Sequence, residues 1–262
     1  MFSHSDGLYL QIEDTVIYTH SVGKATNPVL VLLHGGLGSM LDFNNVAEAL
    51  SEHYYLVGID LRGHGRSPRG LASMSYDQHC EDVLKVLDAL SIESCALLGS
   101  SDGGIVSYLL AANHPQRIAS IVTMGSHWRN SESDVNRSIL EELNVPLWRG
   151  IFSKHVAQYH EVNPSPDFCA LMDDVKALWQ DQAAYSDKDM NAIRCPALLM
   201  RGQDDDLFSA EDANALLESN GKFELATIRN ARHDLLTEPS YDVLSTIHHF
   251  LKTNSTLVPT NA

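Results

Sequence analysis

The chain has 262 residues, of which 44% are hydrophobic and 20% are charged. These values are ordinary for a folded globular protein and exclude collagen-like, coiled-coil and largely disordered chains. Because 18 lysines and arginines face 34 aspartates and glutamates, the net charge of -16 also excludes nucleic acid and anionic membrane surfaces as partners.

Apolar runs of strand length recur along the chain and alternate with segments of helical pattern. Runs such as PVLVLL are apolar at every residue, which is typical of strands buried on both faces of a sheet. The alternation predicts an α/β fold with a mostly parallel sheet flanked by helices. The predicted strands are Leu8 to Glu13, Thr15 to Ser21, Pro28 to Leu33, Tyr54 to Asp60, Cys95 to Gly99, Ile118 to Gly125 and Pro196 to Gly202, with another in FELATIR.

Local signals place helices between these strands. Ser75 is expected to cap a helix, with Gln78 three residues on and an apolar face that follows. A last helix is predicted near Ser240 to Leu251. The tail 253–262 has no periodicity and is expected to be mobile.

The alternation stops in region 127–194, where only helical pieces occur, so this region is predicted to be an insertion. Ser165, which precedes a proline, predicts the start of a helix with an apolar stripe over 168–179. Trp148 and Phe152 either line a ligand pocket, as candidate substrate-binding residues, or pack the insertion onto the sheet, the commoner role of apolar side chains. The same two readings apply to Tyr159.

The stretch ALLGSSDGGIVSYLL contains a candidate nucleophile. A sharp turn from strand to helix needs small residues two places before and two places after a nucleophilic serine. Ser101 meets this requirement with Gly99 and Gly103, whereas centring on Ser100 would put leucine and aspartate at those places. Ser101 is therefore the predicted nucleophile.

A serine hydroxyl needs a base and an acid to be activated. The stretch GQDDDLF, which follows a predicted strand, offers Asp204, Asp205 and Asp206. His233 lies on a later loop that also follows a strand, and the order serine, acid, histidine is the one expected for this kind of triad.

Two backbone N–H groups are needed to stabilise the oxyanion. One is expected from the residue after the nucleophile, Asp102, and the other from Gly36 in the loop of LVLLHGGLGS. His34 in the same loop is expected to order the loop rather than to act as a catalyst. This chemistry requires neither a metal nor a cofactor.

The stretches HGGLGS, DLRGHGRS, GSSDG, RGQDDDLF and NARHD together resemble the α/β-hydrolase superfamily over nearly the whole chain. The resemblance implies a hydrolase core of residues 1–126 and 195–262, with 127–194 forming a helical cap over the site. It also implies Asp205 as the acid, because the family's acid usually stands three residues after the glycine that closes its strand. Arg232 departs from the family, which commonly has glycine before the histidine.

The resulting prediction is a serine hydrolase of small carboxylic esters that works through an acyl-enzyme. GSSDGG resembles the branch that contains valacyclovir hydrolase, which suggests amino-acid esters. Carbon–carbon bond hydrolases and thioesterases of the same fold are alternatives, and a non-catalytic ligand receptor is an alternative of another class. Ser101 separates the chain from related dehalogenases and epoxide hydrolases, which use aspartate at that position.

Asp102 has two explanations. An acid in the first turn of a helix interacts favourably with the helix dipole. A carboxylate beside the nucleophile opposes the negative charge of the oxyanion, so the alternative is that Asp102 pairs with the ammonium group of an amino-acid ester.

Location and assembly are predicted from what the sequence lacks. The first residues, MFSHSDGLYLQIED, have no basic start followed by an apolar run, and no later stretch approaches the ~18 apolar residues of a membrane span. The four cysteines form no Cys-x-x-Cys pair and are expected to be reduced thiols. We expect a cytoplasmic monomer or homodimer that acts on a small molecule.

Overall fold

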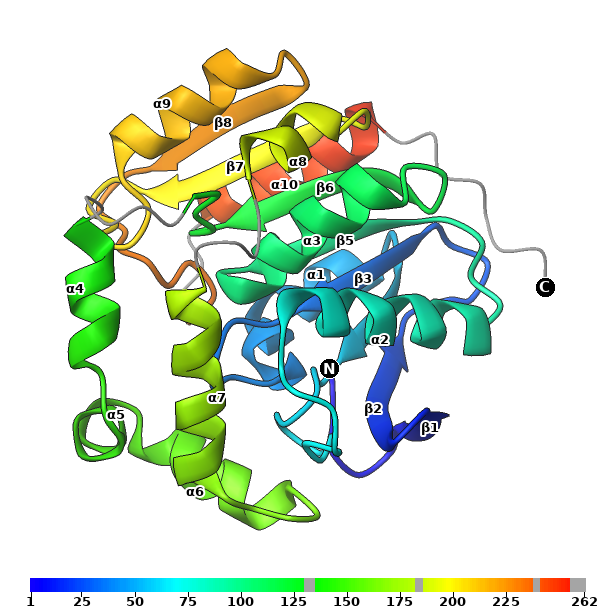
Figure 1. The fold of residues 1–262 in the computed structure, drawn as a ribbon. Helices are drawn as coiled ribbons and strands as arrows, with labels where there is room; N and C mark the ends of the chain where they lie inside the picture. The colour runs from blue at the N-terminus through cyan, green and yellow to red at the C-terminus, as the bar shows by residue number, and fades with distance from the viewer. Residues whose placement is uncertain (130–134, 182–185, 238–240, 255–262) are drawn as a thin grey trace.

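The computed structural model describes residues 1–129, 135–181, 186–237 and 241–254. Within them, eight strands form one sheet in the order β1-β2-β4-β3-β5-β6-β7-β8. β2 pairs antiparallel with both β1 and β4, and the remaining neighbours are parallel. The predicted α/β fold with a mostly parallel sheet is therefore confirmed (Figure 1).

Seven of the strands begin and end within one residue of the predicted bounds, and the eighth is the strand expected in FELATIR. The apolar runs identified them because a two-sided core demands such runs. The strands are β1 Leu8–Ile12, β2 Thr15–Val22, β3 Val29–Leu33, β4 Tyr55–Ile59, β5 Cys95–Ser100, β6 Ile118–Met124, β7 Ala197–Gly202 and β8 Phe223–Ile228.

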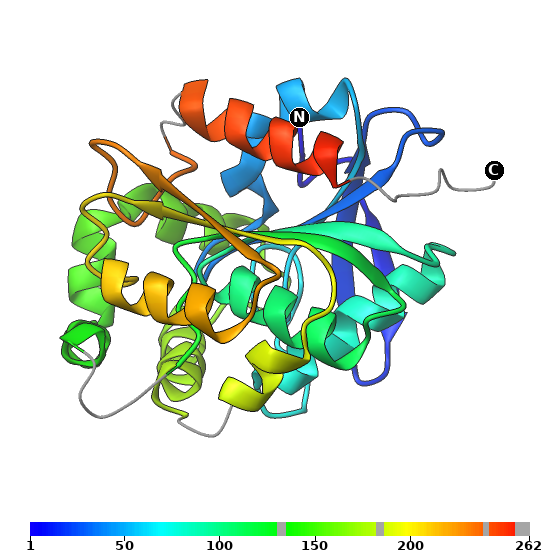
Figure 2. The same ribbon diagram turned by 90° about the horizontal axis from the view of Figure 1, so that it is seen from above.

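Helices cover both faces of the sheet (Figure 2). α1 and α10 lie on one face, and α2, α3, α8 and α9 lie on the other. Ser75 caps α2 as predicted, since its side chain accepts the Gln78 N–H. The bounds are α1 Asn44–Ser51, α2 Tyr76–Ala89, α3 Asp102–Asn113, α8 Asp187–Ala192, α9 Ala210–Ser219 and α10 Tyr241–Thr253, with a 3-10 helix η1 at Met40–Phe43.

The central strand β3 shows how the sequence produces two hydrophobic layers. Val29, Val31 and Leu33 belong to the cluster under α2 and α3, while Leu30 and Leu32 belong to the cluster under α1 and α10. Successive side chains of a strand point to opposite faces, so a wholly apolar strand supplies both clusters.

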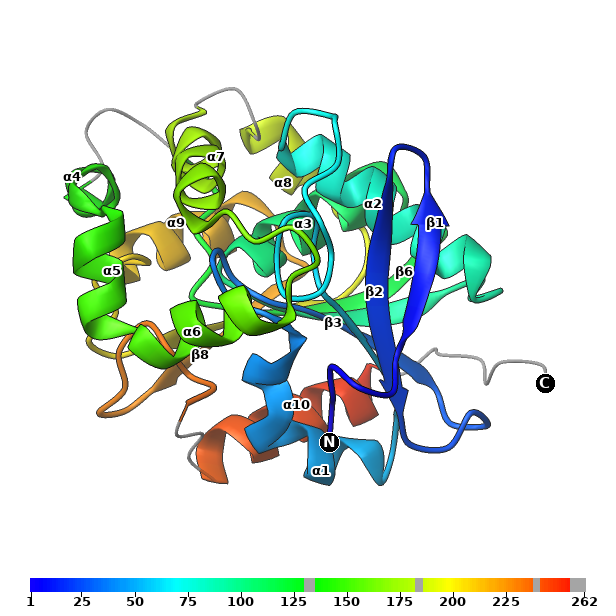
Figure 3. The same cartoon turned by 90° about the horizontal axis from the view of Figure 1, so that it is seen from below.

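Four helices of the insertion, α4 Val135–Glu142, α5 Val145–Ile151, α6 Ser153–Val162 and α7 Phe168–Gln180, lie together beside the edge of the sheet (Figure 3). The buried side chains of α6 and most of those of α7 form a separate cluster with Leu37, which belongs to the loop after β3, and partly buried side chains such as Leu140 and Trp148 pack against this cluster. The insertion is thereby packed against that loop.

Three details differ from the sequence-based expectations. α7 begins at Phe168 rather than at Ser165, because the Asp167 side chain accepts the Ala170 N–H and caps the helix. α8 lies within the predicted insertion 127–194, but its Met190 packs in the hydrophobic cluster between the sheet and the helices α2 and α3. α10 continues to Thr253, so the predicted tail 253–262 begins inside this helix. Residues 255–262 of the tail lie outside the described residues, as does Ser240, the predicted start of the last helix.

The described residues contain no helix long and apolar enough to cross a membrane. All four cysteines are free thiols, and Cys80 and Cys95 are buried.

Candidate active site

Ser101 lies at a strained turn between β5 and α3. Its backbone has φ 49° and ψ -116°, an unfavourable conformation for a residue with a side chain. The turn leaves no space for side chains around it: a methyl group on Gly99 would lie 2.3 Å from the Gly103 oxygen, and one on Gly103 would lie 2.0 Å from the Leu33 oxygen. This crowding is the physical reason for the Gly-x-Ser-x-Gly spacing.

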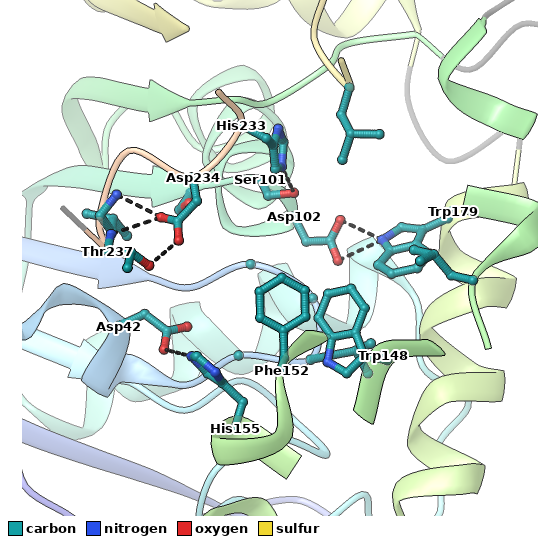
Figure 4. Close-up of a pocket in the computed structure, with 18 of the residues that line it drawn as sticks. Asp42, Ser101, Asp102, Trp148, Phe152, His155, Trp179, His233, Asp234 and Thr237 are labelled. Atoms are coloured by element: carbon teal, nitrogen blue, oxygen red, sulfur yellow. Dashed lines mark hydrogen bonds and ion pairs between the residues drawn. The ribbon is translucent and has the colours of Figure 1, made fainter. Parts of the chain in front are cut away.

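Ser101, His233 and Asp205, the predicted nucleophile, base and acid, lie in contact. The Ser101 Oγ is 3.2 Å from the His233 Nε2 (Figure 4). The other ring nitrogen, Nδ1, is 3.0 Å from the Asp205 Oδ1 and 3.3 Å from its Oδ2. With Nδ1–H donating to the carboxylate, Nε2 is free to accept the serine proton.

Asp205 is buried and well supplied with donors. Its Oδ1 accepts the backbone N–H groups of Leu207 at 2.8 Å and Phe208 at 3.0 Å. Burial alone would raise the pKa of Asp205, but the hydrogen bond and charge of His233, together with these N–H groups, hold the pKa below its ordinary value. The carboxylate is therefore ionised at neutral pH.

The other two acids of this loop do not face the histidine. Asp204 and Asp206 are exposed, and Asp206 forms an ion pair with Arg232. The Arg232 side chain is 78% exposed, so the arginine that departs from the family pattern points to solvent and not into the site.

The loop after β3 lies against the turn that carries Ser101. A methyl group on Gly35 would lie 3.1 Å from the Ser101 Cβ, and one on Gly36 would lie 2.4 Å from the Asp102 Oδ2. His34 is fully buried, accepts the Leu61 N–H at its Nε2 and contacts the Gly35 oxygen through its Nδ1. Its two ring nitrogens are thus engaged in fixing the loop.

The Asp102 carboxylate, which is 4% exposed, is held by two neutral donors. The Trp179 Nε1–H lies 3.0 Å from each of its oxygens, and the Tyr76 hydroxyl donates to Oδ1 at 2.9 Å. Burial raises the pKa of Asp102, and these two hydrogen bonds act in the opposite direction. Neither partner of Asp102 was predicted from the sequence, although a buried indole N–H usually requires an acceptor.

A cavity of about 400 Å³ opens over Ser101. Both Trp148 and Phe152 line it, their rings 4.5 Å apart between centroids, whereas Tyr159 packs inside the insertion. Its charged or titratable lining residues, within the described part of the chain, are Asp42, Asp102, His127, His155, His233 and Asp234.

His155 of α6 and Asp42 of η1 meet at the wall of the cavity, 3.5 Å apart (Figure 4). The hydrogen bond to Asp42 raises the pKa of His155, and the charges of Asp42 and Asp234 act in the same direction. This pair was not predicted from the sequence, because it joins segments more than a hundred residues apart.

The arrangement can carry out acyl transfer. A hydroxyl that touches an imidazole, which in turn touches a buried carboxylate, can lose its proton as it attacks a carbonyl carbon. In the parts of the chain that the structure describes, no cluster of three or more His, Cys, Asp or Glu side chains could hold a metal ion.

Comparison with known proteins gives consistent matches. A model of the alpha/beta hydrolase fold matches residues 28–177. A provisionally named esterase/lipase of Haemophilus influenzae is 26% identical, over 90% of this chain and 87% of the relative. A 2-hydroxy-6-oxo-2,4-heptadienoate hydrolase of Pseudomonas putida is 25% identical, over 88% and 91%. The solved enol-lactonase of Burkholderia xenovorans has a TM-score of 0.76 at 21% identity, covering 94% of this chain and all of that one.

Proposed function

Because this chain belongs to the alpha/beta hydrolase fold family, we propose that it is a serine hydrolase that cleaves small carboxylic esters through an acyl-enzyme. Hydrolysis is the common activity in the names of the relatives described above. The observation that carries the narrower proposal is the contact between Ser101, His233 and the buried Asp205.

In the proposed reaction, the Ser101 Oγ attacks the ester carbonyl while the His233 Nε2 takes its proton. Asp205 stabilises the imidazolium through Nδ1–H. The backbone N–H groups of Gly36 and Asp102 stabilise the oxyanion. The intermediate collapses, the alcohol leaves with the proton from His233, and a water activated by the same histidine then releases the acid.

The position of the insertion supports its proposed role as a cap over the site. Residues from α5, α6 and α7 line the cavity beside Ser101, and the volume of about 400 Å³ suits a small substrate. The predicted cap of residues 127–194 is part of the proposal, with α4 to α7 as the helices beside the cavity, since α8 packs on the sheet. The cytoplasmic location and the monomeric or dimeric state are also part of the proposal.

Charge in the cavity bears on the substrate. Its described lining includes three carboxylates, those of Asp42, Asp102 and Asp234, and neither lysine nor arginine. A dienoate such as the substrate named for the Pseudomonas putida relative is itself a carboxylate, and in the described lining it would meet three carboxylates but no lysine or arginine. The lining therefore favours neutral or cationic esters over the carbon–carbon bond substrates.

Amino-acid esters are the narrower candidate, in line with the resemblance to the valacyclovir hydrolase branch. The observation in their favour is the buried carboxylate of Asp102 next to Ser101, whose two hydrogen-bond donors, Trp179 and Tyr76, carry no positive charge. A substrate ammonium would supply the missing counter-charge.

A substrate panel tests this function. Purified protein would be assayed with matched short-chain p-nitrophenyl esters, an acyl thioester, an α-amino ester and a 2-hydroxy-6-oxodienoate. The proposal expects turnover of the esters that Ser101→Ala abolishes. Faster turnover of the dienoate than of every ester would establish the carbon–carbon alternative, and turnover of nothing would favour the ligand receptor.

A further inference from the structure

Helix α7 of the insertion lies directly on the loop that is expected to supply an oxyanion donor. A methyl group on Gly36 would lie 2.9 Å from the Trp179 Cζ2 and 3.1 Å from the Val175 Cγ1. Both side chains are buried. Two side chains of α7 therefore pack directly against Gly36.

Trp179 also holds the other expected oxyanion residue. Its Nε1–H is shared by both oxygens of Asp102, at 3.0 Å each. The same Asp102 carboxylate touches Gly36, because a methyl group there would lie 2.4 Å from Oδ2. Trp179, Asp102 and Gly36 are thus each in contact with the other two. The Trp179 side chain therefore touches both residues that are expected to supply oxyanion donors.

From these contacts we propose that Trp179 is a positioning residue for the oxyanion hole. It fixes the spacing between the Gly36 and Asp102 N–H groups, so the rate of hydrolysis depends on the position of α7 relative to the loop after β3. This rests on the proposed function. It assigns a catalytic consequence to the insertion beyond shaping the cavity.

The physical requirement is geometric. Oxyanion donors act only when they lie about 2.7–3.1 Å from the oxygen as it becomes charged, so a shift of a few tenths of an ångström weakens them. Without the indole N–H, the Asp102 carboxylate would keep the Tyr76 hydroxyl but lose its tie to α7. Its negative charge would also be less well stabilised beside the forming oxyanion.

The expected signature is a loss confined to the transition state. A group that only positions the oxyanion donors lowers kcat and leaves KM nearly unchanged. The effect should also depend on the atom that receives the hydrogen bonds. A thionoester develops its charge on sulfur, a larger and poorer acceptor, and so gains less from these donors than the matching oxygen ester.

The experiment compares Trp179→Phe with Val175→Ala, on an ester and its thionoester. Val175→Ala removes packing over Gly36 but leaves the bond to Asp102. Trp179→Phe is expected to lower kcat for the ester by about 10- to 100-fold, part of the 10²–10³-fold cost of losing one donor. Its ester-to-thionoester rate ratio should fall about as much, whereas Val175→Ala, which keeps the hydrogen bond between Trp179 and Asp102, should lower the ratio less than Trp179→Phe does.

A second substitution guards against misfolding of the phenylalanine variant. Incorporating benzothienylalanine at position 179 replaces the indole N–H by sulfur and preserves the ring size, so it removes only the hydrogen bond to Asp102. The same fall in the rate ratio is expected.

Two failures are distinguishable. If wild type hydrolyses the ester through Ser101, but both replacements at Trp179 keep kcat and the rate ratio within about twofold, Trp179 only packs and the inference is overturned. If wild type turns over no ester and its Ser101 does not react with a fluorophosphonate, the proposed function fails and the inference fails with it.

Discussion

Asp205→Asn is the substitution whose effect the geometry defines most closely. The Asp205 Oδ1 accepts two backbone N–H groups, from Leu207 and Phe208, so the amide oxygen of asparagine must take that position. The neutral amide oxygen thus stays 3.0 Å from the His233 Nδ1, and the amide nitrogen takes the place of Oδ2, 3.3 Å from the same ring nitrogen. An N–H donor there favours the tautomer with the proton on Nε2, which cannot accept the proton of Ser101.

The expected loss combines this wrong tautomer with the missing charge. It amounts to about 10³–10⁴-fold in kcat, which corresponds to about 4–5.5 kcal/mol of transition-state stabilisation. Asp204→Asn is the matched control, because Asp204 lies in the same loop and is exposed. That variant should stay within about threefold of wild type, as surface changes usually do.

The assay is steady-state hydrolysis of a p-nitrophenyl ester, with circular dichroism and thermal unfolding to verify the fold of each variant. Equal losses of kcat in Asp204→Asn and Asp205→Asn would show that Asp205 is not the acid that orients His233. So would a folded Asp205→Asn variant that retains more than about a tenth of wild-type kcat.

Three further outcomes are expected. His155→Gln should lower the free energy of unfolding at pH values below 6.5, because the ion pair of His155 with Asp42 needs the protonated ring. The difference from wild type should shrink as pH rises through the raised pKa of His155. Chemical denaturation at about pH 5.5 and about pH 9 measures this, and an equal difference at both pH values would contradict it. Asp102→Asn should cost an α-amino ester ~2 kcal/mol or more in kcat/KM relative to its desamino analogue; an equal loss for both would return Asp102 to a role at the helix start. Arg232→Gly should change kcat/KM less than about threefold, since Arg232 is exposed and pairs with Asp206; a large loss would show that it acts in the site.

The sequence predicted well those elements in which the local residue pattern follows directly from the packing that the fold requires. A strand buried on both faces, such as β3, must be apolar throughout, so its sequence alone identifies it. The turn at Ser101 could be located because crowding requires glycine at two fixed positions. His233 and the acidic loop could be located because loops after parallel strands meet at the carboxyl end of the sheet, and the family resemblance selected Asp205 among the three acids of that loop.

The elements that the sequence did not reveal depend on contacts between distant segments. The indole of Trp179 reads as one more member of an apolar helix stripe, yet it donates to Asp102, 77 residues away. Ser165 and Asp167 are both acceptable helix caps, and only the folded backbone selects Asp167. The direction of Arg232 likewise follows from its pairing with Asp206.

Covalent labelling can show whether Ser101 is the nucleophile. Wild-type protein would be incubated with a fluorophosphonate and the modified residue identified by peptide mass spectrometry, with Ser100→Ala and Ser101→Ala in parallel. We expect a single adduct on Ser101 in wild type and in Ser100→Ala, and none in Ser101→Ala. An adduct on Ser100, or labelling that survives Ser101→Ala, would contradict it.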